Sequence, residues 1–197
     1  MPGAHEHAEH AEEAEHIAGS NKKVALLISV LALFLAISEM LGKAAQTEGL
    51  DANIKASDTW AFYQAKTIRM TTLETAAQTL KADLTSVTDP VAREAKQKLI
   101  ERWEKTAARY ESDPEKHEGR KELMDHAREL ESERDLALTK YHHYEIASAV
   151  IEIGIVLASA SVITGMIALA WLAGGLGLVG LALMAIGFYA PHALHLV

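Results

Sequence analysis

Two long apolar tracts constrain this chain more than any other feature of its sequence. Residues 24–41 and 146–190 together contain 63 residues but only two charged side chains, Glu39 and Glu152. The rest of the chain carries the other 44 of the 46 charged side chains. Water-soluble globules do not separate apolar and charged residues in this way. The partition therefore predicts a membrane protein with a very polar part outside the membrane.

The first tract predicts a transmembrane helix at residues 24–41, preceded by an N-terminal tail at residues 1–23. Its 18 residues fall slightly short of the about 20 that cross a bilayer. Lys22, Lys23 and Lys43 flank the tract, and their long side chains can reach the headgroups. A cleaved signal peptide is the alternative. The 23-residue leader with five Glu favours an uncleaved anchor.

The second tract is long enough for two further spans. No Asp, Glu, Lys or Arg occurs from Ile153 to Val197. Gly174-Gly175 is the expected turn, because glycine adopts the left-handed conformation that ends helices. The predicted segments are transmembrane helices at 144–172 and 176–190 and a C-terminal tail at 191–197.

The pattern of residues 42–143 predicts a charged helical hairpin. The expected fold class is therefore all-α, with three transmembrane helices and a coiled-coil-like hairpin between the first and the second. Gly42 and Gly49 are expected to break the chain after the first span. Thr88-Asp89-Pro90 and Ser112-Asp113-Pro114 are typical helix starts, with a capping Asp followed by Pro. A helix starting near Glu115 would continue into the second span.

Between these breaks, apolar residues recur at the spacing of a helix face. The three stripes are Leu73, Ala77, Leu80, Leu84 and Val87; Ile100, Trp103, Ala107 and Tyr110; and Leu123, Ala127, Leu130, Ala137, Tyr141, Tyr144 and Ser148. Many apolar positions of the hairpin are Ala, so a monomeric hairpin would bury little apolar surface. We therefore expect a homo-oligomer whose charged faces are solvated.

Three carboxylates, Glu39, Glu145 and Glu152, lie towards the hairpin side of the apolar tracts. Ionisable groups in a membrane are costly, which makes each a candidate functional residue. Glu152 follows Glu145 by seven residues, on the same helix face and about 10 Å deeper. In an oligomer the three could form an acidic vestibule for cations or protons. Alternatively, Glu39 and Glu145 reach interfacial water and Glu152 bonds to a neighbouring helix.

The N-terminal tail contains four histidines among its glutamates: His5, His7, His10 and His16. Imidazole and carboxylate groups are ligands that zinc, copper and nickel accept. The spacing matches no closed structural zinc site, and the chain has no cysteine. An acidic amphipathic or disordered tail is the favoured interpretation, and a weak divalent-metal site is the alternative. No other cofactor is expected.

Several function classes find no support in the sequence. The chain lacks GxSxG, HExxH, P-loop and Rossmann glycine motifs, so we expect no enzyme activity. The adjacent His142 and His143 with Glu145 resemble an acid–base cluster, but neighbouring residues cannot share one helix face. The formal net charge of −8 argues against a nucleic-acid partner, which would need a basic surface.

Residues 54–69 read IKASDTWAFYQAKTIR, and this segment resembles the signature of the DUF4337 family, bacterial membrane proteins of unknown function. The resemblance covers most of the chain: leader, anchor, charged helical middle and paired C-terminal spans occur in the same order. It implies no activity. We interpret the motif as an oligomerisation or membrane-collar element, with ligand binding as the alternative. Its candidate residues are Trp60, Phe62, Tyr63, Gln64, Lys66 and Arg69.

The resemblance and the apolar tracts together predict a multi-pass protein of the bacterial inner membrane. Lys22 and Lys23 indicate a cytoplasmic N-terminus and a periplasmic hairpin. The basic residues near the membrane on the hairpin side, Lys43, Lys55, Arg134 and Lys140, favour the opposite orientation. The predicted function is a non-enzymatic, homo-oligomeric scaffold or an accessory subunit of a larger membrane complex. The alternatives are a cation or proton conduit and a metal-binding protein.

Overall fold

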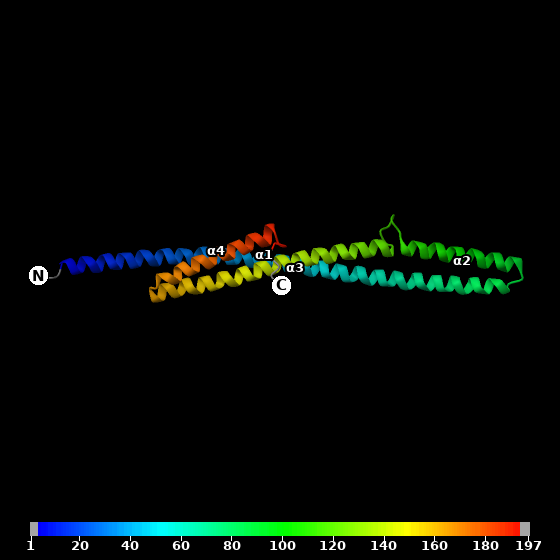
Figure 1. The fold of residues 1–197 in the computed structure, drawn as a ribbon, viewed down its shortest axis with the longest axis horizontal. Helices are drawn as coiled ribbons and strands as arrows, with labels where there is room; N and C mark the ends of the chain where they lie inside the picture. The colour runs from blue at the N-terminus through cyan, green and yellow to red at the C-terminus, as the bar shows by residue number, and fades with distance from the viewer. Residues whose placement is uncertain (1–3, 194–197) are drawn as a thin grey trace. The chain divides into compact units, whose positions relative to one another are not determined.

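The computed structural model describes the backbone of residues 4–193 and the side chains of residues 22–193. Over this part of the chain all regular structure is helical, as the sequence predicts (Figure 1). The four α-helices are α1 (Ala4–Asp83), α2 (Pro90–Glu111), α3 (Arg120–Thr164) and α4 (Ile167–Tyr189), with a 3-10 turn at Leu84–Ser86. By length and composition, α1, α3 and α4 can each cross a membrane.

The chain divides into two compact units. We call the first the apolar unit: it comprises the described residues up to Gly49 and from Leu136 onward. The second, the charged unit, is Leu50–Asp135. Long helices contribute to both, because α1 and α3 each contain an apolar stretch and a charged stretch.

Helix α1 continues through Gly42 and Gly49, so the predicted breaks at these glycines are wrong. Both glycines instead allow α3 to approach closely. A Cβ atom at Gly42 would lie 3.4 Å from the Cβ of Tyr144, and one at Gly49 would lie 3.2 Å from Cδ2 of Leu138. Glycine costs about 1 kcal/mol in a helix relative to alanine. Packing, rather than a change of chain direction, accounts for these two residues.

The turn between α3 and α4 lies at Gly165, nine residues before the predicted Gly174-Gly175. Gly165 has a φ of 73°, the left-handed conformation that glycine adopts readily. The hydroxyl of Ser161 donates to the carbonyl of Met166 across this turn, at 3.0 Å. The predicted boundaries 144–172 and 176–190 are corrected accordingly. They left only 15 residues for the last span, whereas α4 has 23, enough for a bilayer.

Helices α1, α3 and α4 lie together in the apolar unit (Figure 1), and its core is formed between them. Its buried residues are Leu31, Ala45, Tyr144, Ala147, Ile151 and Met184. Glycines of α4 face this core: a Cβ at Gly177 would lie 2.5 Å from Leu31, and one at Gly180 would lie 2.5 Å from Ile151. Small residues therefore set the distance between these helices, as is common where helices pack in lipid.

In the charged unit, α1 packs against α2 and the beginning of α3. The buried apolar residues are Ala52, Ala56 and Ala77 on α1, Ile100 and Ala107 on α2, and Leu123, Ala127 and Leu130 on α3. Six of these eight belong to the predicted stripes, which therefore face inward as expected. Alanine dominates this seam, so each contact buries little area.

One predicted helix start is confirmed and the other is wrong. The carboxylate of Asp89 accepts the amide N–H groups of Val91 and Ala92 at 3.1 and 3.4 Å and caps α2. After Asp113 the chain makes a single turn instead, since its carbonyl accepts from the amides of Lys116 and His117. His117 then has a φ of 54°, which a helix does not allow, and α3 begins only at Arg120.

Candidate functional site

A pocket of about 440 Å³ opens between α1 and α3 within the apolar unit. It brings together the three carboxylates that the sequence analysis selected, Glu39, Glu145 and Glu152. We call it the acidic pocket. Its lining residues are Ser38, Glu39, Gly42, Lys43, Gln46, Tyr141, Tyr144, Glu145, Ser148, Ala149 and Glu152.

Small residues on α1 hold the two helices together beside the acidic pocket. The buried hydroxyl of Ser38 donates to the backbone carbonyl of Tyr144 at 3.0 Å. Gly42, one turn further along α1, leaves room for the side chain of Tyr144. Ser38, Gly42 and Ala45 follow the four- and three-residue spacing of one helix face, so the sequence itself directs this face towards α3.

Polar groups of α3 surround Glu145 in the acidic pocket. The hydroxyl of Tyr141 donates to its Oε1 at 3.2 Å, and Nδ1 of His142 lies 3.7 Å from its Oε2. Glu39 and Glu152 are exposed. Carboxylate, hydroxyl and amide oxygens are ligands for hard cations, and carboxylates also exchange protons. No sequence pattern marks Tyr141, Lys43 and Gln46 as pocket residues, because only the pairing of α1 with α3 brings them there.

The carboxylates of the acidic pocket do not form one chelating site. Among residues 22–193, no three His, Asp or Glu side chains are close enough together to hold a metal ion. The pocket therefore holds separate carboxylates rather than a preformed chelating group.

The two adjacent histidines of α3 point in different directions, as expected. His142 is partly exposed beside Glu145, whereas His143 is 1% exposed. Nδ1 of His143 lies 2.9 Å from the carbonyl of Thr139, and its buried Nε2 has no hydrogen-bond partner within the described residues. A Cβ at Gly187 of α4 would lie 2.8 Å from the Cβ of His143. The side chain of this α3 histidine is therefore buried against α4.

The motif of residues 54–69 lies in the charged unit, where part of it packs against the break between α2 and α3. We call this region the motif junction. Nε1 of Trp60 donates to Oε1 of Glu131 on α3 at 3.0 Å. The rings of Trp60 and Tyr63 meet edge to face, with centroids 5.4 Å apart. The hydrogen bond joins α1 to α3, and the ring contact, which lies within α1, supports the position of the Trp60 ring.

Lys66 places a nearly buried charge in the motif junction. The residue is 8% exposed, and its Nζ lies 5.0 and 5.2 Å from the ring centroids of Phe62 and Tyr110. The carboxylate of Glu118, in the loop before α3, lies 3.5 Å away. Two aromatic faces and one carboxylate thus compensate for the lost hydration of the ammonium group.

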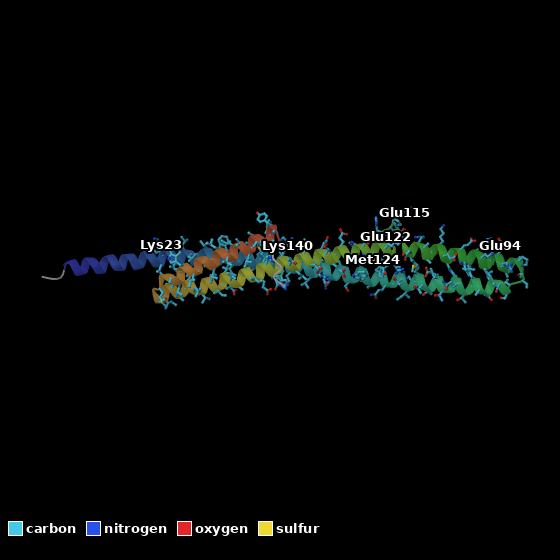
Figure 2. All side chains as sticks on the ribbon, in the orientation of Figure 1. Lys23, Glu94, Glu115, Glu122, Met124 and Lys140 are labelled. Carbon is cyan, nitrogen blue, oxygen red and sulfur yellow. The ribbon has the colours of Figure 1, made fainter. Side chains whose placement is uncertain are left out.

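Arg120 links the start of α3 to the motif and to the end of α2. Its Nη2 donates to the hydroxyl of Tyr63 at 3.0 Å, and its Nη1 donates to Glu111 at 2.8 Å. Two residues further on, Glu122 (labelled in Figure 2) accepts from the hydroxyl of Ser112 and the amide of Asp113, at 2.6 and 3.2 Å. Only glycine fits at position 119 beside this loop, because a Cβ there would lie 2.4 Å from the backbone nitrogen of Asp113.

The remaining candidate residues lie elsewhere. Gln64 and Arg69 of the motif are exposed on α1. The side chains of His5, His7, His10 and His16 fall outside the described residues, so the metal site of the tail stays a prediction. Trp60, Tyr63 and Lys66 serve contacts within the chain. The motif junction is thus built from mutual side-chain contacts, whereas the acidic pocket is open.

A model of one protein family matches residues 20–190, which is most of the chain. The description of that family is a domain of unknown function, DUF4337. No curated protein and no solved structure matches the chain. The match includes both the acidic pocket and the motif junction. The chain therefore belongs to the DUF4337 family, as its motif at residues 54–69 predicts.

Proposed function

We propose that the protein is a non-enzymatic membrane protein with three spans, which acts as a homo-oligomeric scaffold or as an accessory subunit of a larger membrane complex. The observation that carries this proposal is the outward exposure of its apolar helices. Only 17%, 28% and 17% of the most apolar windows of α1, α3 and α4 are buried within the chain. Leu33, Val156 and Leu178 are each at least 60% exposed. Such apolar surface is stable in lipid or against other subunits.

The spacing of polar and aromatic residues supports insertion into a bilayer. Lys23 and Lys43 are 20 residues apart on α1, about 30 Å along a helix. Trp171 and Tyr189 of α4 are both exposed and about 27 Å apart along the helix. Both lengths match the hydrocarbon core of a bilayer, about 30 Å thick, with lysine and aromatic side chains at its borders.

The motif junction supports a structural role. The side chains of Trp60, Tyr63 and Lys66 are engaged in contacts with α3 and with the loop that precedes it. The alanine-rich seam of the charged unit buries little area per residue, which favours additional packing between subunits. Both features suit a part of the protein whose task is to hold helices together.

The mass of the full-length protein in nanodiscs tests this proposal. The protein should resist extraction from membranes by alkaline carbonate, and light scattering should then give a mass of at least two subunits. Extraction by carbonate would contradict the membrane proposal. A monomer that also purifies without a stoichiometric partner would contradict the scaffold proposal.

For the orientation, we propose a bacterial inner membrane with the N-terminus in the cytoplasm and the charged unit in the periplasm. Lys22 and Lys23 before the first span support this orientation. Alkaline phosphatase inserted in the exposed loop after Glu115 should be active, because the enzyme folds only in the periplasm. A green fluorescent protein at the N-terminus should fluoresce. The reverse pattern of signals would contradict the orientation.

The acidic pocket supports a second candidate function, a conduit for cations or protons. It gathers Glu39, Glu145 and Glu152 between α1 and α3. Proteoliposomes loaded with a pH-sensitive dye, or with a potassium-sensitive dye, should then show proton or potassium flux, which E152Q reduces. E48Q is the matched control, since Glu48 is exposed on α1 and does not line the pocket. Absent flux, or equal flux with E152Q, would dispose of the conduit.

A further inference from the structure

The side of α1 that faces away from α2 and α3 carries no charge over three heptads. Between Ala61 and Ala82, the residues that repeat at four- and three-residue steps on this side are all uncharged. They are Ala61, Ala65, Ile68, Thr72, Thr75, Thr79 and Ala82. Six are exposed, Ala65 is partly so, and Ile68 is 68% exposed. We call these seven residues the outer seam. A solvated helix face normally carries charged side chains.

The other helices of the charged unit show what a solvated face looks like in this protein. The exposed residues of α2 include Arg93, Glu94, Lys98, Glu101, Arg102 and Lys105. Figure 2 labels Glu94 as an example. The exposed residues of α3 include Lys121, Asp125, Arg128, Glu129, Glu133 and Asp135. The lack of charge on the outer seam is therefore specific to α1 and indicates a face that another helix covers.

The surface at the centre of the outer seam is hollowed. A shallow groove of about 580 Å³ is lined by Thr67, Ile68, Thr71, Thr72, Thr75 and Ala76. Side chains of a neighbouring helix insert into hollows of this kind when two helices pack with a seven-residue repeat. Ala61, Ile68 and Thr75 are seven residues apart, and their side chains are the ones that would insert into the groove of a second helix.

The two exposed motif residues identify the partner as a second copy. Gln64 and Arg69 flank the outer seam and are five residues apart. In two parallel helices in register, flanking residues five positions apart lie opposite each other across the seam. Gln64 of one copy would therefore accept a hydrogen bond from Arg69 of the other. The two-fold symmetry of such a pair repeats this contact on both sides.

We propose that the outer seam of α1 is the surface through which two copies of this chain associate, with their α1 helices parallel and in register. This inference rests on the proposed membrane scaffold, since two copies inserted in one membrane present α1 in the same direction. Asp58 and Asp51 continue the same repeat towards the N-terminus. Two copies would bring these like charges together, so the close pairing ends before Ala61.

The outer seam alone is too small for a stable dimer. Its length, from Ala61 to Ala82, is about 32 Å along the helix. A strip about 10 Å wide then buries several hundred square ångströms per copy, whereas specific interfaces bury about 1,200–2,000 Å² in total. The apolar units must supply the remaining area, and the experiment therefore uses the full chain in its membrane.

Disulfide crosslinking tests the pairing cleanly, because the natural chain contains no cysteine. The single variants A65C and T79C lie on the outer seam, and E101C on the exposed face of α2 is the matched control. Membranes that contain each variant are treated with copper phenanthroline and run on a non-reducing gel. A65C and T79C should form disulfide dimers, while E101C should stay monomeric.

The same variants distinguish the alternatives. An antiparallel pair centred on the groove would bring position 65 opposite position 78. A dimer in membranes of cells that express A65C and Q78C together, without self-linking of A65C, would therefore overturn the parallel arrangement. Equal linking of E101C would indicate random collision and overturn the seam. If light scattering shows an oligomer but neither seam variant links, the seam is wrong while the scaffold stands. A monomer by light scattering would refute the seam, and a monomer that also purifies without a stoichiometric partner would refute the scaffold as well.

A charged residue on the outer seam supplies the second measurement. I68E in the T79C background places two carboxylates opposite each other in an apolar contact, which should slow the formation of the disulfide dimer about tenfold. Ile68 is exposed within one chain, so the substitution leaves the fold of the subunit intact. E94K in the same background is the control and should leave the rate unchanged. An unchanged rate with I68E would overturn the proposal.

Discussion

The two units of this protein hold their helices together in different ways. In the apolar unit, α1, α3 and α4 approach through small residues such as Ser38, Gly177 and Gly180. In the charged unit, an alanine seam is completed by the charged and aromatic contacts of Lys66 and Arg120. The difference follows from the surroundings that we propose. In lipid, close contact between backbones is the main attraction, whereas in water a thin apolar seam needs specific polar contacts to fix its register.

The largest effect is expected from G119A in the charged unit. An added methyl group would lie 2.4 Å from the nitrogen of Asp113 and 2.6 Å from the Cα of Ser112, so the backbone itself must move. We expect the unit to lose about 3 kcal/mol of unfolding free energy. Hydrogen exchange of the amides in residues 112–123 measures this loss. K116A in the same loop is the control, and equal protection in both variants would contradict the prediction.

The next effect is expected from R120K, also in the charged unit. Arg120 donates to Tyr63 and Glu111 with two different nitrogens, whereas one ammonium group cannot reach both. The lost hydrogen bond should cost about 1–2 kcal/mol. Thermal unfolding of the full chain in detergent, followed by circular dichroism, provides the measurement. R128K on the exposed face of α3 should leave the transition in place. A similar decrease of the unfolding temperature in both variants would mean that the two hydrogen bonds of Arg120 do not stabilise the fold.

A smaller loss is expected from G180A in the apolar unit. The added methyl group would meet Cγ1 and Cδ1 of Ile151 at 2.5 and 3.0 Å, and this side chain can partly adjust. We expect a loss of about 1 kcal/mol, measured by unfolding in increasing dodecyl sulfate. G174A is the matched control, because its new Cβ meets nothing within 4 Å among the described residues. If G174A destabilises the protein as much, close packing is not what Gly180 provides.

The smallest effect concerns acid. The hydroxyl of Ser112, followed by the backbone N–H groups of Glu122 and Asp113, lowers the pKa of Glu122 below its ordinary value of 4.5. A carboxylate whose pKa is lowered in the folded state stabilises the fold at pH values above its ordinary pKa. This contribution is lost as the pH falls through the pKa of the folded state. Protection of residues 112–123 should therefore decrease between about pH 5 and pH 3. E122Q should flatten the decrease, apart from the part due to Asp83, whose pKa Lys96 lowers. An equal slope in E122Q would assign the decrease to other groups.

The sequence predicted those parts of the fold that follow from local periodicity. The all-helical class, the inward stripes of α2 and α3, and the cap at Asp89 depend on residues within a few turns of each other. Glycines were harder to interpret, because the same residue type serves turns and close packing. Gly165 forms a turn, whereas Gly42 and Gly49 make room for α3. Only the paired helices distinguish these uses.

The candidate site was predictable in its charges and not in its shape. Glu39, Glu145 and Glu152 stood out because carboxylates are rare in apolar tracts, and the acidic pocket contains all three. Tyr141 and Gln46 carried no such signal, since tyrosine and glutamine are common near charged helices. For the motif, the sequence indicated an unusual cluster around Trp60. It did not reveal that Trp60 bonds to Glu131, a residue 71 positions away.

The break between α2 and α3 has a consequence for how this family can change in length. Residues 112–119 separate two helices that pack against the same long helix α1. A residue gained or lost within α2 rotates the following helical positions by about 100°, but the rotation ends where the helix ends. The turn at residues 84–89, at the other end of α2, can absorb the change, so that Glu111 keeps its contact with Arg120 and α3 keeps its alignment with Trp60 and Tyr63. Natural insertions and deletions should therefore accumulate in the first part of α2 and in the turn before it, while the spacing from Glu111 to Glu131 stays fixed.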